Sequence, residues 1–307
     1  MFKFAKEQKI FDIGGVKVGG QPGQLPTVLL GSIFYQGHKI VEDQKKGLFD
    51  WEMAEALLVT EEEESRRTGN PRIVDVVGSW PEAMVKYIDF VADTTETPLS
   101  LDCADTRVAL AAIKHVDEVG LAGRVLLNSI NPVTEPVVTS AMKDAGVTSA
   151  ILLTLNTRMP TVSGRLEVLE GKEEGKGLLA LAEAAGVENT LIDTTVLGIP
   201  DPGPVSKAIY LVKEQFGLPA GCGAHNALGR WRERRELDKT TRLICNVAIH
   251  VMPITMGADF MLYGPISRAH VIYSACAMAD AYVAYDMRQE YRVTPLTREH
   301  PLFKLFA

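Results

Sequence analysis

Short apolar segments alternate with amphipathic segments along most of the chain. Each apolar segment is bounded by glycine, proline or polar residues, which is typical of a strand buried on both faces of a parallel sheet. The pattern predicts eight strands, at residues 27–33, 72–78, 99–102, 125–130, 150–156, 190–195, 219–225 and 258–263.

The amphipathic segments predict a helix after each strand. Asp50 is placed to cap the first of these helices, which is expected to end near Arg67. Pro81 opens the second at a first-turn position, where its missing N–H carries no cost. The remaining helices are expected at 104–119, 135–144, a segment ending near 185, 205–216, 227–251 and 266–287.

This alternation decides the fold class. Strands separated by helices pair in parallel through right-handed crossovers. Eight such units in 307 residues predict an α/β protein with a (β/α)8 TIM barrel, in a single domain spanning residues 1–307. The competing fold is an open doubly wound sheet, but no Gly-x-Gly-x-x-Gly follows the first strand.

The two ends of the chain fall outside the repeat. Residues 1–26 form an N-terminal extension, in which a hairpin is expected at residues 9–20, turning at Gly14-Gly15 and covering one end of the domain. Residues 288–307, with two prolines, form a C-terminal tail. The polar loop at 35–47 is expected to shape the rim of the barrel.

Composition and charge narrow the function. Hydrophobic residues make up 46% of the chain, the net charge is −7, and no run is long and apolar enough to span a bilayer. We therefore expect a cytoplasmic protein that binds neither nucleic acid nor membranes. Its four cysteines form no Cys-x-x-Cys pair, so no disulfide framework is expected.

Polar residues recur where the predicted strands end. In a barrel these ends converge on the face that carries the active site. Asp and Asn also favour turns and helix caps for local reasons, but a set at equivalent positions favours a shared site. The set consists of Asp75, Asp102, Asn128, Asn156, Asp193 and Asn226.

The chemistry of this set is restrictive. None of the six histidines has a metal-binding spacing, so we expect no metal. No phosphate-binding Gly-x-x-x-x-Gly-Lys loop is present, so the sequence offers no nucleotide site of that kind. Carboxylates and carboxamides suit hydrogen bonds to a polar, planar ligand. A carboxylate facing two parallel N–H groups fits an aminopyrimidinone ring.

Several segments resemble one protein family closely. They include Phe-Asp-Ile-Gly-Gly-Val-Lys-Val-Gly-Gly-Gln-Pro-Gly at residues 11–23, Gly-Ser-Ile-Phe-Tyr-Gln-Gly-His-Lys at 31–39, Ile-Val-Asp-Val-Val-Gly-Ser at 73–79 and Tyr-Ile-Asp-Phe-Val-Ala-Asp at 87–93. The chain resembles the H subunit of tetrahydromethanopterin S-methyltransferase. Within that family it is most similar to the bacterial branch that transfers methyl groups between methylcorrinoids and tetrahydrofolate, as in glycine betaine catabolism.

The resemblance implies a pterin-binding barrel and assigns roles to strand-end residues. Asp193 is expected to accept the 2-amino and N3 protons of the pterin, while Asp102 and Asn128 hold its N1/N8 side. Asn226 is expected to approach N5, the atom that carries the methyl group. Further candidates are Asp75, Asn156, Ser129 and His225; relatives place a small residue where His225 stands.

The implied reaction is methyl transfer from methylcobalamin to N5 of tetrahydrofolate, with Asn226 and Asp102 as the catalytic residues. An amide oxygen at N5 would stabilise the positive charge that develops there. The chain lacks the Asp-x-His-x-x-Gly run typical of corrinoid carriers. We therefore expect the cobalamin to arrive free or on a corrinoid protein that docks at the barrel mouth.

Three other functions remain open. The chain could transfer the methyl group from pterin to corrinoid as a subunit of a larger complex. It could be a dihydropteroate-synthase-like enzyme, which needs a lysine near the end of strand seven and basic loop residues such as Arg230 and Arg232. It could also be a pterin-binding module. Separately, the apolar region 244–285 favours a homodimer.

Overall fold

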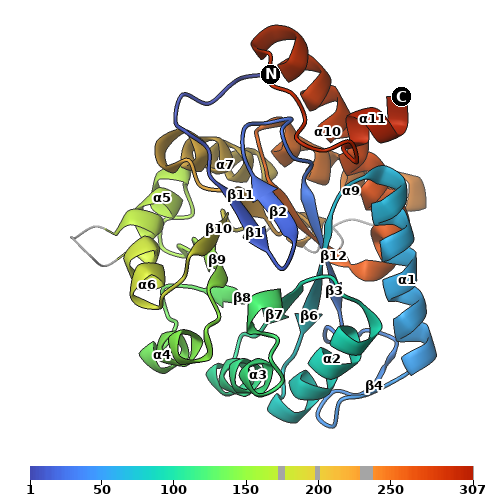
Figure 1. The fold of residues 1–307 in the computed structure, drawn as a ribbon, viewed down its shortest axis with the longest axis vertical. Helices are drawn as coiled ribbons and strands as arrows, with labels where there is room; N and C mark the ends of the chain where they lie inside the picture. Colours follow the sequence, from blue (N-terminus) through green and yellow to red (C-terminus); the bar gives the residue numbers. More distant parts are fainter. Residues whose placement is uncertain (172–176, 198–200, 229–237, 307) are drawn as a thin grey trace.

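In the computed structural model, eight parallel strands close into a barrel (Figure 1). The structure describes residues 1–171, 177–197, 201–228 and 238–306. Around the barrel the strands run in chain order, and β12 closes onto β3. They are β3 (Val28–Ile33), β6 (Arg72–Val77), β7 (Leu99–Asp102), β8 (Val125–Ile130), β9 (Ser149–Leu153), β10 (Asn189–Asp193), β11 (Ala220–Cys222) and β12 (Phe260–Pro265). The predicted TIM barrel is confirmed.

Helices surround the barrel and cover its outer face (Figure 1). Asp50 caps the first of them, as predicted, by accepting a hydrogen bond from the Met53 N–H. The helices are α1 (Trp51–Thr68), α2 (Pro81–Thr94), α3 (Thr106–Glu118), α4 (Pro136–Ala145), α5 (Val162–Glu170), α6 (Leu178–Ala184), α7 (Pro202–Phe216), α9 (Lys239–Thr255), α10 (Ala269–Tyr291) and α11 (Pro301–Phe306). None of these described helices combines the length and apolar character that a membrane span needs.

Three elements differ from the predicted boundaries. The segment between β9 and β10 contains two helices, α5 and α6. Residues 226–228 are helical, in agreement with the predicted start near 227, and helix α9 begins again at Lys239 behind an Asp238 cap that accepts from two backbone N–H groups and extends to Thr255 rather than 251. The loop at 35–47 contains strand β4 (Val41–Asp43), which pairs with β5 (Leu48–Phe49). The polar composition of this segment predicted a loop without strands.

The strands alternate between two cores, as a period of two requires. Outward side chains pack against the helices in one large cluster. Inward side chains form a separate small core near the amino-terminal ends of the strands. That core holds Val28, Leu30, Ile73, Leu126, Ile151, Leu191 and Phe260.

An antiparallel hairpin of β1 (Ile10–Ile13) and β2 (Val16–Gly19) closes this end of the barrel. Its turn lies at Gly14 and Gly15, whose φ angles of 53° and 90° suit glycine. Ile13 and Val18 are buried in the same cluster as the inward strand residues. The hairpin therefore plugs the amino-terminal end and leaves the opposite end as the mouth.

A buried ion pair fastens this plugged end. Lys213 of α7, 1% exposed, donates to both oxygens of Asp259 at 2.6 Å and to the Gly20 carbonyl at 3.0 Å. Asp259 also accepts from the Ala220 N–H at 2.9 Å. These bonds link the segment after the hairpin to α7, β11 and β12.

We predict that Lys213→Met lowers the free energy of unfolding by about 3–5 kcal/mol, because it leaves the Asp259 carboxylate buried without its cation. Urea denaturation measures the loss. The control Lys207→Met removes an exposed lysine from the same helix and is expected to cost less than about 0.5 kcal/mol. Equal effects of the two variants would contradict the role given to the buried pair.

Candidate functional site: a polar layer in the barrel mouth

The inward side chains become polar at the mouth, directly above the apolar core. Residues i and i+2 of a strand face the same way, and on β3, β6, β8 and β10 the last apolar inward residue is followed by a polar one. Ser32 follows Leu30 in this sense, and Asp75 follows Ile73. The layer consists of Ser32 (β3), Asp75 (β6), Ser100 and Asp102 (β7), Asn128 (β8) and Asp193 (β10).

Asp75 is the hub of this layer. It is fully buried and accepts hydrogen bonds from the Ser32 and Ser100 hydroxyls, both at 2.7 Å, and from Asn128 Nδ2 at 3.2 Å. Strand register produces this arrangement, since Ser32, Asp75 and Ser100 lie side by side on β3, β6 and β7. Burial raises the pKa of Asp75, and the three donors oppose that rise.

Asp102 stands beside Asn128 in the strand register but has a different environment. Within the described part of the chain, no group donates a hydrogen bond to its carboxyl. Burial, and then the charge of Asp75, raise its pKa well above the ordinary value. Because Asp75 holds three donors, we assign the negative charge to Asp75 and the proton to Asp102.

Asp193 lies across the lumen at the end of β10. It is 6% exposed, and its Oδ1 accepts from the Thr195 N–H at 2.6 Å. Burial raises its pKa to about 6, opposed by backbone N–H groups of Thr195 and Gly223 and by the charge of Arg165. Asp193 is therefore mainly a carboxylate at neutral pH, able to accept from a ligand.

His225 and Asn226 follow β11, in a turn that leads into a helical segment at 226–228. Asn226 is exposed, and a Cβ on Gly223 would come within 3.1 Å of its Nδ2. His225 packs against the backbone of Gly264, whose φ is 80° and where any Cβ would overlap the imidazole ring. His225 therefore has a packing role. Arg230 and Arg232, which follow this segment, lie outside the described residues.

The structure does not bring Asn156 and Ser129 into the polar layer. Asn156 stabilises its own loop, donating to the Gly164 carbonyl at 3.1 Å and accepting from the Met159 N–H at 2.9 Å. Ser129 lines a small hollow outside the barrel wall, beside Cys103 and Ala109 of the α3 segment. The structure therefore places these two possible site residues apart from the layer formed by Asp75, Asp102, Asn128 and Asp193.

Sequence reasoning missed Ser32, Ser100 and Arg165. The two serines carried a usable signal, because each lies two residues from an inward position of its own strand. Arg165 carried none, since a charged residue in an amphipathic helix ordinarily faces solvent.

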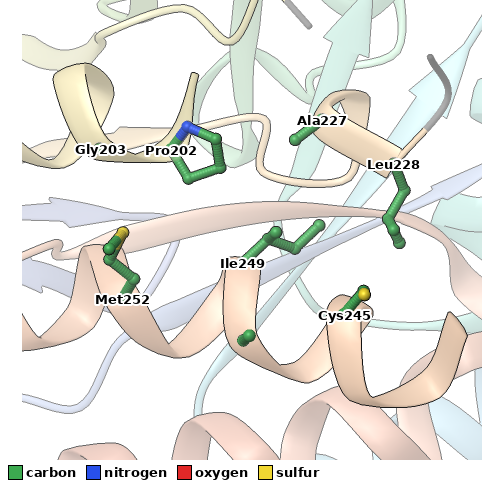
Figure 2. A pocket seen from close by; sticks show the side chains of 8 residues that line it. Pro202, Gly203, Ala227, Leu228, Cys245, Ile249 and Met252 are labelled. Atoms are coloured by element: carbon green, nitrogen blue, oxygen red, sulfur yellow. The ribbon is translucent and has the colours of Figure 1, made fainter. Parts of the chain in front are cut away.

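Away from the polar layer, a cavity of about 410 Å³ opens between the start of α7 and α9 (Figure 2). Apolar side chains line it, including Leu228, Ile249 and Met252. Its described lining lacks the polar groups that recognise a pterin edge. Within the described ranges, no three histidine, cysteine, aspartate or glutamate side chains lie close enough to hold a metal ion.

Comparison with known proteins identifies relatives along nearly the whole chain. A family model described as the tetrahydromethanopterin S-methyltransferase MtrH subunit matches residues 6–295. The H subunit of tetrahydromethanopterin S-methyltransferase from Methanothermobacter thermautotrophicus is 40% identical over 99% of this chain and 100% of its own. The H subunit of the putative methyltransferase mtx from Methanosarcina barkeri is 39% identical over 98% and 99%.

Solved structures show the same fold in distant proteins. Yersinia pestis dihydropteroate synthase with a pterine-sulfa conjugate aligns with a TM-score of 0.60 and 14% identity, over 90% of this chain and 98% of that one. The Xanthomonas albilineans enzyme in complex with 7,8-dihydropteroate gives 0.55 and 17%, over 89% and 98%. At this identity the likeness establishes the barrel fold alone.

Asp75 and Asp102 should respond oppositely when each is replaced by asparagine. Because the folded-state pKa of Asp102 is raised, its contribution to stability is present at low pH and is lost as pH rises. Asp102→Asn should therefore raise the melting temperature at pH 8 and leave it nearly unchanged at pH 4.

Asp75→Asn is the matched comparison. It replaces one of the two accepting oxygens by an N–H2 group, which then faces either the Ser32 hydroxyl or the Ser100 and Asn128 donors, and should destabilise the fold at pH 8 by about 2–3 kcal/mol. Thermal and urea unfolding at the two pH values measure both variants. If Asp102→Asn destabilised the protein at pH 8 as much as Asp75→Asn, the assignment of the proton to Asp102 would be wrong.

Proposed function

Because the chain belongs to the family of the H subunit of tetrahydromethanopterin S-methyltransferase, we propose that it transfers a methyl group between a pterin in the barrel mouth and a corrinoid. The observation that carries this proposal is the polar layer above the apolar barrel core. It offers the Asp193 carboxylate opposite the neutral carboxyl of Asp102 and the carboxamide of Asn128. We propose methylcobalamin as the methyl donor and tetrahydrofolate as the acceptor.

Asp193 recognises the aminopyrimidinone edge in this proposal. A carboxylate that faces the 2-amino and N3 protons makes two parallel, charge-assisted hydrogen bonds. Across the lumen, N1 of the ring needs a donor and N8–H needs an acceptor. A protonated Asp102 and the amide of Asn128 each provide one donor and one acceptor, so both fit that side.

Transfer takes place at N5, toward the mouth. Asn226 is exposed there, and its amide oxygen would face the positive charge that develops on N5 as it attacks the methyl group. Holding the ring by Asp193, Asp102 and Asn128 converts the encounter with the methyl donor into an oriented, in-line displacement. Asp75 orients Asn128 through its hydrogen bond.

The corrinoid reaches the ring from outside in this account. Asp102 and Asn128 are partly exposed, which is consistent with a mouth that is open for a docking corrinoid protein or free methylcobalamin. We further propose that the chain belongs to the bacterial, cytoplasmic branch that serves glycine betaine catabolism. Reverse transfer within a larger complex is the second candidate, favoured by the relatives that are named as subunits.

A dihydropteroate-synthase-like condensation fits less well. Residues 219–238, at and after β11, contain no lysine to assist it.

The apolar surface of α9 and α10 supports a homodimer, since Ile244 and Met252 are 62% and 46% exposed and Tyr282 is 61% exposed. Sedimentation at micromolar concentration tests the dimer; a monomer there would contradict it.

The purified chain, mixed with methylcobalamin and tetrahydrofolate, tests the proposed reaction. We expect formation of 5-methyltetrahydrofolate, followed by mass spectrometry, together with the spectral change of the corrinoid. Binding of tetrahydrofolate without turnover in either direction, even with an added corrinoid protein, would favour a pterin-binding module.

Two variants separate binding from transfer. Asp193→Ala removes two charge-assisted hydrogen bonds and should weaken tetrahydrofolate binding at least about 100-fold. Asn226→Ala should leave Kd within about threefold and slow transfer by roughly 100-fold. Calorimetry and single-turnover rates measure these effects.

Asn131→Ala is the control, because this asparagine caps its own turn by accepting from the Val133 N–H. Its Kd and transfer rate are expected to match those of the unmodified chain. Normal tetrahydrofolate binding by Asp193→Ala would refute the assigned orientation of the pterin.

A further inference from the structure

Arg165 of α5 is buried behind the carboxyl end of β10. It is 1% exposed, and its guanidinium joins two loops of the mouth. Nε donates to the Thr194 carbonyl at 2.6 Å, and Nη2 donates to the Thr195 carbonyl at 3.0 Å. Nη1 donates to the Pro160 carbonyl at 3.1 Å, in the loop that precedes α5.

An acidic partner completes this arrangement. Nη2 of Arg165 lies 3.0 Å from both carboxylate oxygens of Asp201, which is 8% exposed. Asp201 also accepts from the Leu197 N–H at 2.6 Å. The same pair therefore holds the backbone on both sides of the turn that follows Asp193.

That turn sets the direction of the Asp193 carboxylate. Thr195 has a φ of 57°, an unusual value for a β-branched residue, and its N–H donates to Asp193 Oδ1. Such a conformation persists only where neighbouring groups determine it. Here the neighbouring groups include the Gly221 carbonyl, which accepts from the Thr194 N–H at 3.0 Å, and Arg165, which binds the carbonyls of Thr194 and Thr195.

Arg165 also supplies a positive charge near Asp193. Among the described residues, the other titratable groups near Asp193 are Asp201, which pairs with Arg165, and the thiol of Cys222 on β11, whose pKa burial raises. Asp75 and Asp102 lie across the lumen. Among these groups Arg165 alone favours the ionised form of Asp193.

We propose that Arg165 is a positioning residue for pterin recognition, which fixes the turn that aims Asp193 and places a positive charge near its carboxylate. The inference rests on the proposed function, because it assumes that Asp193 grips the ring. It adds a residue that touches neither pterin nor methyl donor but acts through Asp193.

The pH dependence of tetrahydrofolate binding tests this role, since a structural contribution alone would not move it. In the unmodified chain, affinity should be constant above pH 7 and fall below about pH 6, as Asp193 takes up a proton. Arg165→Met should raise the midpoint by about one pH unit. Arg165→Lys keeps the charge, so its midpoint should stay near the original, while affinity at pH 8 falls roughly tenfold because the fork of hydrogen bonds is lost.

Two controls define the outcomes. Arg72→Met removes another buried arginine, which donates to Glu62 and Thr95 at the opposite end of the barrel. It should lower the melting temperature without moving the midpoint. Asp193→Asn should abolish the pH dependence, which attributes the midpoint to Asp193 rather than to the ligand.

An unchanged midpoint in Arg165→Met, or unchanged affinity at pH 8 in Arg165→Lys, would overturn the inference while leaving the proposed function intact. Absence of tetrahydrofolate binding by the unmodified chain would overturn both. Because the lysine variant retains a buried cation opposite Asp201, it provides a folded protein for measurement even if the methionine variant does not fold.

Discussion

Closure of the parallel barrel is the constraint on which the site depends. Every strand must turn one set of alternate residues into a narrow lumen, and a hairpin seals the amino-terminal end of that lumen with Ile13 and Val18. Polar side chains can therefore approach one another only in the layer nearest the open mouth. Asp75, Asn128 and Asp193 occupy that layer because each stands two residues beyond an apolar inward side chain.

Within this layer, local surroundings give three aspartates three different properties. Asp75 receives three hydrogen bonds and is assigned the charge of its pair, while Asp102 receives none from the described residues and is assigned the proton. Asp193 is ionised near neutral pH because backbone N–H groups and the buried Arg165 oppose the effect of its burial. One ionised and one neutral carboxyl on opposite sides of the lumen match the two different edges of a pterin ring.

The sequence predicted the barrel, the Gly14-Gly15 hairpin and the family, because strand period, turn chemistry and local motifs are all properties of neighbouring residues. It also located Asp75, Asn128 and Asp193 at inward strand ends. Asn156 was misplaced because an asparagine that ends a strand and one that caps a loop look alike in sequence. Arg165 was missed because its contacts with Thr194 and Thr195 span about thirty residues and arise only from tertiary packing.

A crystal structure with tetrahydrofolate bound would test the central claim most directly. The account predicts the pterin ring within the lumen, with its 2-amino group and N3 within hydrogen-bond distance of the Asp193 carboxylate, and with N5 turned toward Asn226 and the open mouth. A ring bound instead in the apolar cavity between α7 and α9, or held in the lumen without contact to Asp193, would contradict it.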